Sequence, residues 1–217
     1  MSAIADHRFM GLALAMARSQ LGRTAPNPAV GCVLVKDGRI VATGATADGG
    51  RPHAERAALD KAAGLSRGCT AYVTLEPCAH HGRTPPCAEA LIEAGVTRVV
   101  VACLDRYHEV DGRGVSMLEA AGITVETGLG ETDAAPLYAG FFQRLETGRP
   151  LVFADSRRAP YDATFDPVPE AEIDAALDAL GDRGLSRVRV EPDTPFAAAL
   201  IERGLARPAA YRGNTLY

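Results

Sequence analysis

Three short segments of the sequence carry side chains that bind transition metals. They are His53-Ala-Glu55, Glu76-Pro-Cys78 and Cys87, which follows two prolines. Thiolate and imidazole ligands select zinc, and three protein ligands leave the fourth tetrahedral position for water. A carboxylate beside such a site moves protons between the water and a leaving amine. The set predicts one catalytic zinc ion per chain, held by His53, Cys78 and Cys87, with Glu55 as general base and general acid.

A closed structural zinc site is the alternative interpretation of the same residues. It needs a fourth ligand, and His80 and His81 are available next to Cys78. A single H-x-E tripeptide or a single cysteine pair also occurs by chance. We favour the catalytic interpretation because a histidine at a helix start, a strand, a cysteine and a second helix-start cysteine follow one another in the order found in zinc deaminases.

The hydrophobic pattern around these residues predicts the elements that position them. Asp37-Gly38 suits the tight turn of a β-hairpin, and alternating helices and strands follow it. This order predicts an α/β fold whose sheet is covered on both faces. The expected strands are 30–36, 39–45, 70–75, 98–104 and 123–126, and the expected helices are 6–21, 53–63, 87–94, 115–121 and 131–145.

The composition changes after Gly148-Arg149-Pro150, which predicts a boundary between domain 1–148 and domain 149–217. In the second part we expect strands at 151–154 and 187–190 and helices at 170–180 and 196–203. About seventy residues form a small α/β appendage at the margin of independent stability.

The composition excludes several classes of function. The 217 residues include 23 Lys and Arg against 27 Asp and Glu, a net charge of −4, so we expect no broad basic face for nucleic acid. No segment approaches the roughly 20 apolar residues of a membrane span. The start lacks the pattern of a secretory signal, so the five cysteines are expected to form no disulfides. We expect a cytoplasmic protein without membrane contact.

The segment Thr74-Leu-Glu-Pro-Cys-Ala-His-His-Gly-Arg-Thr-Pro-Pro-Cys87 has eight residues between its cysteines, where the common zinc deaminase form has two. Together with Pro26-Asn-Pro-Ala-Val-Gly-Cys32 and His53-Ala-Glu55, it resembles the deaminase domain of the bifunctional riboflavin-biosynthesis deaminase/reductase family, from about residue 6 to 150. The resemblance implies a cytidine-deaminase-like three-layer α/β/α sandwich with a mixed sheet. It also implies hydrolytic deamination of a pyrimidine nucleotide, diaminohydroxyphosphoribosylaminopyrimidine, with release of ammonia.

The same resemblance implies substrate contacts. Asn27 matches a family position that contacts the substrate, and His80, Arg83 and Asp105 match polar positions around the nucleotide and its phosphate. Composition alone offers a plainer interpretation for two of them, since Asn27 between two prolines suits a turn and Arg83 suits a solvated loop.

Two departures from the family pattern leave alternatives open. Where the family reads Asp-Pro-Asn-Pro, this chain reads Asp105-Arg-Tyr-His, so Tyr107 replaces a substrate-facing asparagine. One alternative is therefore deamination of another aminated heterocycle. Another is a non-catalytic zinc protein that binds a nucleotide or serves as a scaffold for a reductase.

Residues 149–217 resemble a truncated remnant of the family's reductase domain. The entry strand lacks the family lysine, and Pro192 and Asp193 replace the glycines of a Val-Glu-Gly-Gly segment. Glycines there let backbone amides approach a phosphate, whereas proline has no amide hydrogen. We therefore predict no NADPH binding. The role of this part stays open between a packing surface, a homodimer contact and a docking site for a separate reductase.

Overall fold

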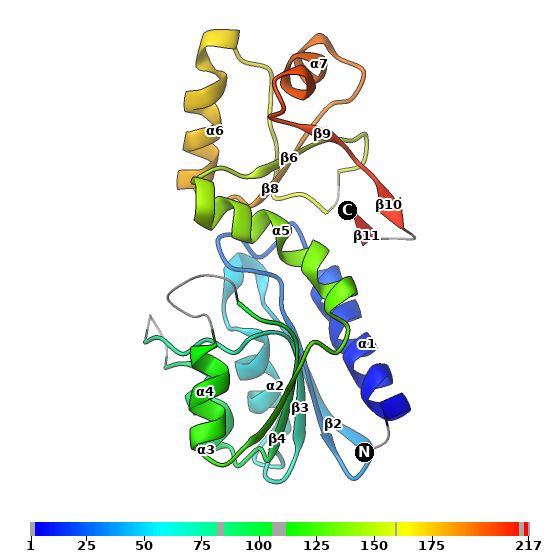
Figure 1. Ribbon diagram of the computed structural model, residues 1–217, viewed down its shortest axis with the longest axis vertical. Coiled ribbons are helices and arrows are strands. Elements are labelled where there is room, and N and C mark those ends of the chain that lie inside the picture. The colour runs from blue at the N-terminus through cyan, green and yellow to red at the C-terminus, as the bar shows by residue number, and fades with distance from the viewer. Residues whose placement is uncertain (1–2, 82–84, 106–111, 159, 213–214, 217) are drawn as a thin grey trace. The chain divides into compact units, whose positions relative to one another are not determined.

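The strands predicted around the candidate zinc ligands form one mixed sheet in the computed structural model of the chain (Figure 1). The structure describes residues 3–81, 85–105, 112–158, 160–212 and 215–216. The sheet has the order β2-β1-β3-β4-β5, and its strands are β1 (Gly31–Lys36), β2 (Arg39–Ala45), β3 (Thr70–Leu75), β4 (Arg98–Cys103) and β5 (Thr124–Thr127). β1 is antiparallel to β2 and β3, whereas β3, β4 and β5 are parallel. The carboxyl ends of β3 and β4 therefore lie at one edge of the sheet, where ligand sites of such sheets form.

Helices cover both faces of this sheet. α1 (Ala3–Ser19) packs against Gly31, and α2 (Ala54–Ala62) packs against Gly44. Gly44 pairs with Cys32, so these two residues lie toward the same face of the sheet. Successive residues of a strand face opposite sides, so Gly31, which precedes Cys32, lies toward the other face. α1 and α2 thus lie on opposite faces, with α3 (Cys87–Glu93) next to α2 and α4 (Arg113–Ala120) next to α3. The three-layer α/β/α arrangement is confirmed, as are the helices and strands predicted for residues 6–145, with ends shifted by a few residues.

The close approach of α2 to β2 depends on Gly44, and this gives a testable prediction. A Cβ atom at residue 44 would lie 2.1 Å from the carbonyl oxygen of Ala54. We expect Gly44→Ala to lower the free energy of unfolding by about 3 kcal/mol, measured by urea unfolding followed by circular dichroism. The matched control is Gly11→Ala in α1, where a Cβ meets nothing within 4 Å. There we expect a gain of up to about 1 kcal/mol, because alanine favours helix. Equal stability of the two variants would contradict the packing argument.

A network of charged side chains joins α1 to the sheet. Arg98 Nη1 and Nη2 donate to the two carboxylate oxygens of Asp6 at 2.9 and 3.1 Å, and the Tyr72 hydroxyl also donates to Asp6. Arg98 also holds Glu126 on the exposed edge strand β5, with an Nε to Oε1 distance of 2.8 Å. The hydrogen bonds from Arg98 lower the pKa of Asp6, and the Tyr72 hydroxyl lowers it further.

This network makes stability depend on pH. Because the folded-state pKa of Asp6 lies below its ordinary value of 3.8, its contribution is fully present above pH 3.8 and is lost as pH falls through the folded-state pKa. We expect Asp6→Asn to lower the free energy of unfolding by about 2 kcal/mol at pH 7. This deficit, which is the difference in the free energy of unfolding between the wild type and Asp6→Asn, should shrink when urea unfolding is measured at pH 3 and below. A deficit that is constant with pH would show that Asp6 acts through packing alone.

The chain divides into two compact units. The first comprises Met1–Gln20, Ala29–Ala47 and Arg51–Ala135, and the second comprises Leu21–Pro28, Asp48–Gly50 and Pro136–Tyr217. The helix α5 (Glu131–Thr147) contributes its first residues to the first unit and the rest to the second. The predicted domain boundary after residue 148 stays a prediction.

The second unit contains a small parallel sheet of order β7-β8-β6-β9. Its strands are β6 (Leu151–Ala154), β7 (Ala163–Thr164), β8 (Arg187–Val190) and β9 (Arg207–Pro208), and a hairpin of β10 (Tyr211–Arg212) and β11 (Thr215–Leu216) follows. α6 (Ile173–Asp182) and α7 (Pro195–Glu202) share one hydrophobic core with this sheet, to which β8 contributes Val188 and Val190. The predicted helices and strands of this part are confirmed. None of the helices described in either unit has the length and apolarity that crossing a bilayer requires.

Candidate functional site

The three predicted metal ligands come from the ends of three elements of the first unit. His53 immediately precedes α2, Cys87 is the first residue of α3, and Cys78 lies in the loop after β3. α2 and α3 pack against each other, and β3 delivers its loop to the same edge of the sheet. The fold thus brings together side chains that are 25 and 9 residues apart in the sequence.

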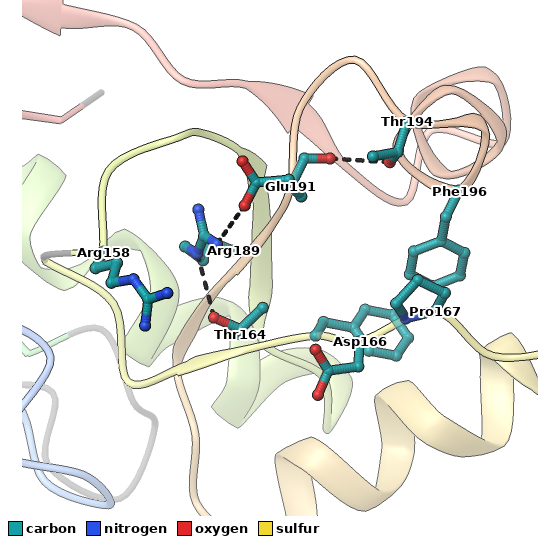
Figure 2. Close-up of a pocket in the computed structure, with 9 residues that line it drawn as sticks. Arg158, Thr164, Asp166, Pro167, Arg189, Glu191, Thr194 and Phe196 are labelled. Atoms are coloured by element: carbon teal, nitrogen blue, oxygen red, sulfur yellow. Dashed lines mark hydrogen bonds and ion pairs between the residues drawn. The ribbon is translucent and has the colours of Figure 1, made fainter.

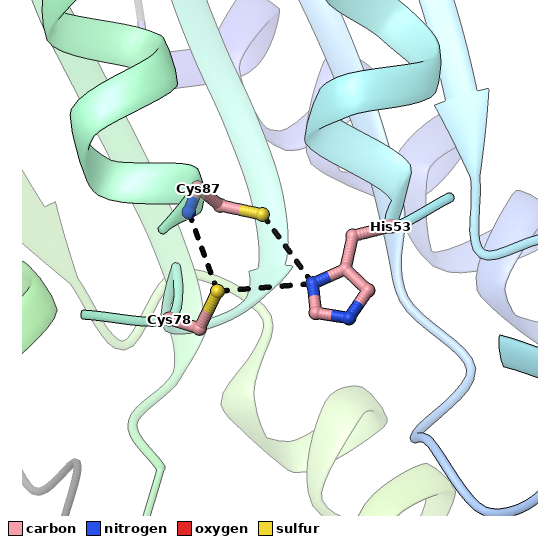
Figure 3. A group of neighbouring side chains, drawn as sticks. All are labelled: His53, Cys78 and Cys87. Carbon is pink, nitrogen blue, oxygen red and sulfur yellow. Dashed lines mark hydrogen bonds between the residues drawn. The ribbon is translucent and has the colours of Figure 1, made fainter. Parts of the chain in front are cut away.

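The side chains of His53, Cys78 and Cys87 face one another (Figure 3). His53 Nδ1 lies 3.7 Å from Cys78 Sγ and 3.4 Å from Cys87 Sγ. All three ligand atoms lie within 4.8 Å of one another, and they form the one group of potential ligands found among the described residues. In a tetrahedral site with ordinary zinc bond lengths, nitrogen and sulfur ligands are about 3.6 Å apart. The donor set therefore fits a zinc ion in chemistry and in spacing.

The electrostatics of the two thiols favour a metal ligand. The hydrogen bond from the Cys87 thiol lowers the pKa of Cys78 to about 4, and His53 and the backbone N–H of Cys87 add to this effect. Conversely, the bond to Cys78 raises the pKa of the Cys87 thiol. The contact with Cys78 also raises the pKa of His53. Cys78 is therefore a thiolate at neutral pH, which is the form that binds metals.

Glu55 lies in the first turn of α2 beside the cluster and is only 3% exposed. Its carboxyl group is in hydrogen-bond contact with the Cys87 thiol. Burial raises the pKa of Glu55 to about 7, and the nearby charge of Cys78 acts in the same direction. A carboxyl group with this pKa gains and loses a proton near neutral pH, as a general acid and base must.

The remaining predicted site residues are less closely tied to the cluster. His80 is exposed, and the buried Asp105 lies two residues after the end of β4. Asn27 belongs to the second unit, where its Nδ2 donates to the carbonyl oxygen of Gly50 at 2.8 Å. Arg83 and Tyr107 lie outside the described residues. The substrate contacts of all four predicted residues, Asn27, His80, Arg83 and Asp105, stay predictions.

The alternative fourth ligands do not join the cluster. His81 is exposed, and its Nε2 lies 3.0 Å from Glu89 Oε1. Among the described residues, neither His80 nor His81 belongs to the group of potential ligands. The described cluster offers three ligands, which is the number that leaves one tetrahedral position for water.

Sequence reasoning gave Glu76 no role, although it lies in the motif Glu76-Pro-Cys78. Glu76 is 4% exposed, and its carboxylate accepts hydrogen bonds from backbone N–H groups of a different segment. The signal in the sequence is an acidic residue directly after a fully buried strand, where an unpaired charge is costly.

Comparisons with known proteins agree with this geometry. Residues 4–103 match the cytidine and deoxycytidylate deaminase zinc-binding region. The riboflavin biosynthesis protein RibD of Escherichia coli is 51% identical over 147 residues, which are 68% of this chain and 40% of that protein. The solved structure of Acinetobacter baumannii RibD has a TM-score of 0.79 at 28% identity, with 99% of this chain and 90% of that chain covered.

A second solved structure is similar to the same extent. The diaminohydroxyphosphoribosylaminopyrimidine deaminase/reductase of Thermotoga maritima has a TM-score of 0.81 at 26% identity, with 92% of this chain and 84% of that chain covered. The chain spans about 40% of the length of the curated relatives it matches. The segment that carries His53, Cys78 and Cys87 thus matches the zinc-binding region of cytidine and deoxycytidylate deaminases, and the chain is similar to the riboflavin biosynthesis protein RibD over 68% of its length.

Proposed function

We propose that the protein is a zinc-dependent hydrolytic deaminase of diaminohydroxyphosphoribosylaminopyrimidine, with one zinc ion per chain. The observation that carries the proposal is the cluster of His53, Cys78 and Cys87 with the buried carboxyl group of Glu55 against it. Three ligands and a proton carrier are what hydrolysis of an exocyclic amine requires. The similarity to RibD and the name of the Thermotoga maritima protein support the substrate.

His53, Cys78 and Cys87 would hold the zinc ion, which when bound lowers the pKa of water to about 7. Glu55 then accepts a proton from the attacking water and delivers it to the amino group that leaves. The water oxygen becomes the ring carbonyl oxygen, its second proton goes to the adjacent ring nitrogen, the C–N bond to the amino group breaks, and ammonia is released. The buried position of Glu55 holds that proton away from bulk solvent between the two transfers.

We propose further that the second unit binds no NADPH, because the turn after β8 does not fit a diphosphate. Pro192 and Pro195 have no amide hydrogen, and the Ala197 N–H already donates to Thr194 Oγ1 at 3.1 Å. The adjacent pocket of about 290 Å³ is lined by two residues that carry carboxylates, Asp166 and Glu191, both labelled in Figure 2. Carboxylates repel a diphosphate.

Arg158 and Arg189 only balance the two carboxylates of the lining, and Arg189 is already engaged, because it donates to Glu191 Oε2 at 2.5 Å and to Thr164 Oγ1 at 3.2 Å (Figure 2). A titration of the protein with NADPH, followed by nucleotide fluorescence, is expected to show no saturable binding. Saturable binding would refute this part of the proposal. A homodimer contact and a docking site for a separate reductase stay alternative predictions for the second unit.

Ammonia release by the zinc-loaded protein tests the proposed function. We expect turnover of the diaminopyrimidine ribosyl phosphate without NADPH. Other aminated heterocycles, such as cytidine and deoxycytidylate, are the matched comparison substrates. Turnover of one of these in place of the diaminopyrimidine would assign a different substrate. Zinc binding without turnover of any of them would support the non-catalytic alternative.

A further inference from the structure

The proposed mechanism gives no role to the buried carboxylate of Glu76, which lies close to the ligand Cys78 in the sequence. Glu76 directly follows β3 and stands two residues before Cys78. Its side chain is buried and is the acceptor for four backbone N–H groups. A buried carboxylate with that many donors is fixed in place, because each charge-assisted bond is stronger than an ordinary one.

The four donors come from two places in the chain. Oε2 accepts from the N–H groups of Asp105 and Gly112, both at 3.2 Å. Oε1 accepts from those of Gly114 at 2.9 Å and Val115 at 3.2 Å. One side chain thus joins the segment after β4 to the first turn of α4. The negative charge also suits the amino-terminal end of a helix.

The main chain next to Glu76 makes two more contacts with the same surroundings. The Glu76 N–H donates to the Cys103 carbonyl oxygen at 2.9 Å, which continues the pairing of β3 with β4. The Pro77 carbonyl oxygen lies against Gly114, where a Cβ atom would be only 2.0 Å away from it. The segment that leads to Cys78 therefore contacts the start of α4 through both the Glu76 side chain and the Pro77 backbone.

We propose that Glu76 is a positioning residue, which holds Asp105 and the first turn of α4 in a fixed place relative to the metal ligand Cys78 and thereby sets the affinity for the substrate. This inference rests on the proposed deaminase function. A carboxylate is required because its two oxygens accept all four bonds. A glutamine side chain has one acceptor oxygen, and its NH2 group would place hydrogen-bond donors against the backbone N–H donors.

The test is Glu76→Gln beside Glu126→Gln. Glu126 also accepts two hydrogen bonds, but from Arg98 at the exposed edge strand. For Glu76→Gln we expect KM for the diaminopyrimidine nucleotide to rise about tenfold, kcat to change less than about threefold, and zinc content to stay unchanged. Amide hydrogen exchange at Asp105, Gly112 and Gly114 should accelerate. Glu126→Gln should change neither KM nor these amides.

Unchanged KM together with unchanged exchange in Glu76→Gln would overturn the inference. If the wild type releases no ammonia, the proposed function fails, and the exchange rates alone still show whether Glu76 fixes the segment. If Glu76→Gln does not fold, Gly114→Ala disturbs the same junction from the other side while it keeps the carboxylate. A rise in KM in Gly114→Ala supports the inference, and an unchanged KM refutes it.

Discussion

Replacement of Glu55 by glutamine is expected to slow ammonia release by about 10²- to 10⁴-fold, the usual contribution of a general acid and base. Glutamine has nearly the same size and shape as glutamate, so the packing of α2 against β2 should persist. It cannot take up and release the proton that burial allows Glu55 to carry near pH 7. The measurement is kcat for ammonia release at pH 7, with the zinc content of the same sample determined by atomic absorption.

The matched control is Glu89→Gln, the same chemical change two residues after the ligand Cys87. Glu89 lies in the first turn of α3 and pairs with the exposed His81, outside the cluster of ligands. We expect its kcat and zinc content to equal those of the wild type. Turnover retained in Glu55→Gln would show that another group carries the proton. A loss of zinc in that variant would show instead that Glu55 supports the metal site.

The elements of the first unit were predictable because their patterns are strong and local. The β-branched apolar run of β4 indicates a strand buried on both faces, and the structure has it almost fully buried. The turn at Asp37 and Gly38 sets the register of the nearest pairs of β1 and β2, Lys36 with Arg39 and Val35 with Ile40, before an irregularity between Leu34 and Val35 shifts it. By contrast, the strands β7, β9, β10 and β11 of the second unit have two residues each. Two residues carry no periodicity, so tertiary contacts alone define these strands.

The candidate site likewise contains residues that the sequence predicts and residues that it does not. The types and order of His53, Cys78 and Cys87 predicted the cluster, since metal chemistry restricts which residues can serve. Glu76 escaped prediction because its partners are backbone N–H groups, which every sequence offers and no motif records. The bond from Asn27 to the Gly50 carbonyl oxygen is of the same kind. Such contacts depend on where two loops meet, and that is decided by the whole fold.

Removal of one metal ligand is expected to have the second largest effect. Cys78→Ala deletes the thiolate and should weaken zinc binding by more than about 100-fold, because even changes around a ligand cost 10- to 100-fold. Zinc affinity is measured by competition with a chromogenic chelator, and ammonia release should fall with zinc content. A chelator should lower the unfolding temperature of the wild type and leave that of Cys78→Ala unchanged, because bound metal stabilises only the folded state to which it binds.

Cys69→Ala separates this effect from the loss of a buried thiol. Cys69 is fully buried and lies just before β3, at the opposite end of that strand from Cys78, with its thiol hydrogen-bonded to the Leu65 carbonyl oxygen. Its replacement leaves a small cavity, for which we expect a cost of about 1 kcal/mol in the free energy of unfolding and no change in zinc affinity. Equal zinc affinities of the two variants would mean that Cys78 is not a ligand. Because Cys78 is the cysteine whose pKa is lowered to about 4, the difference between the two variants should persist at pH 6, where an ordinary thiol is protonated.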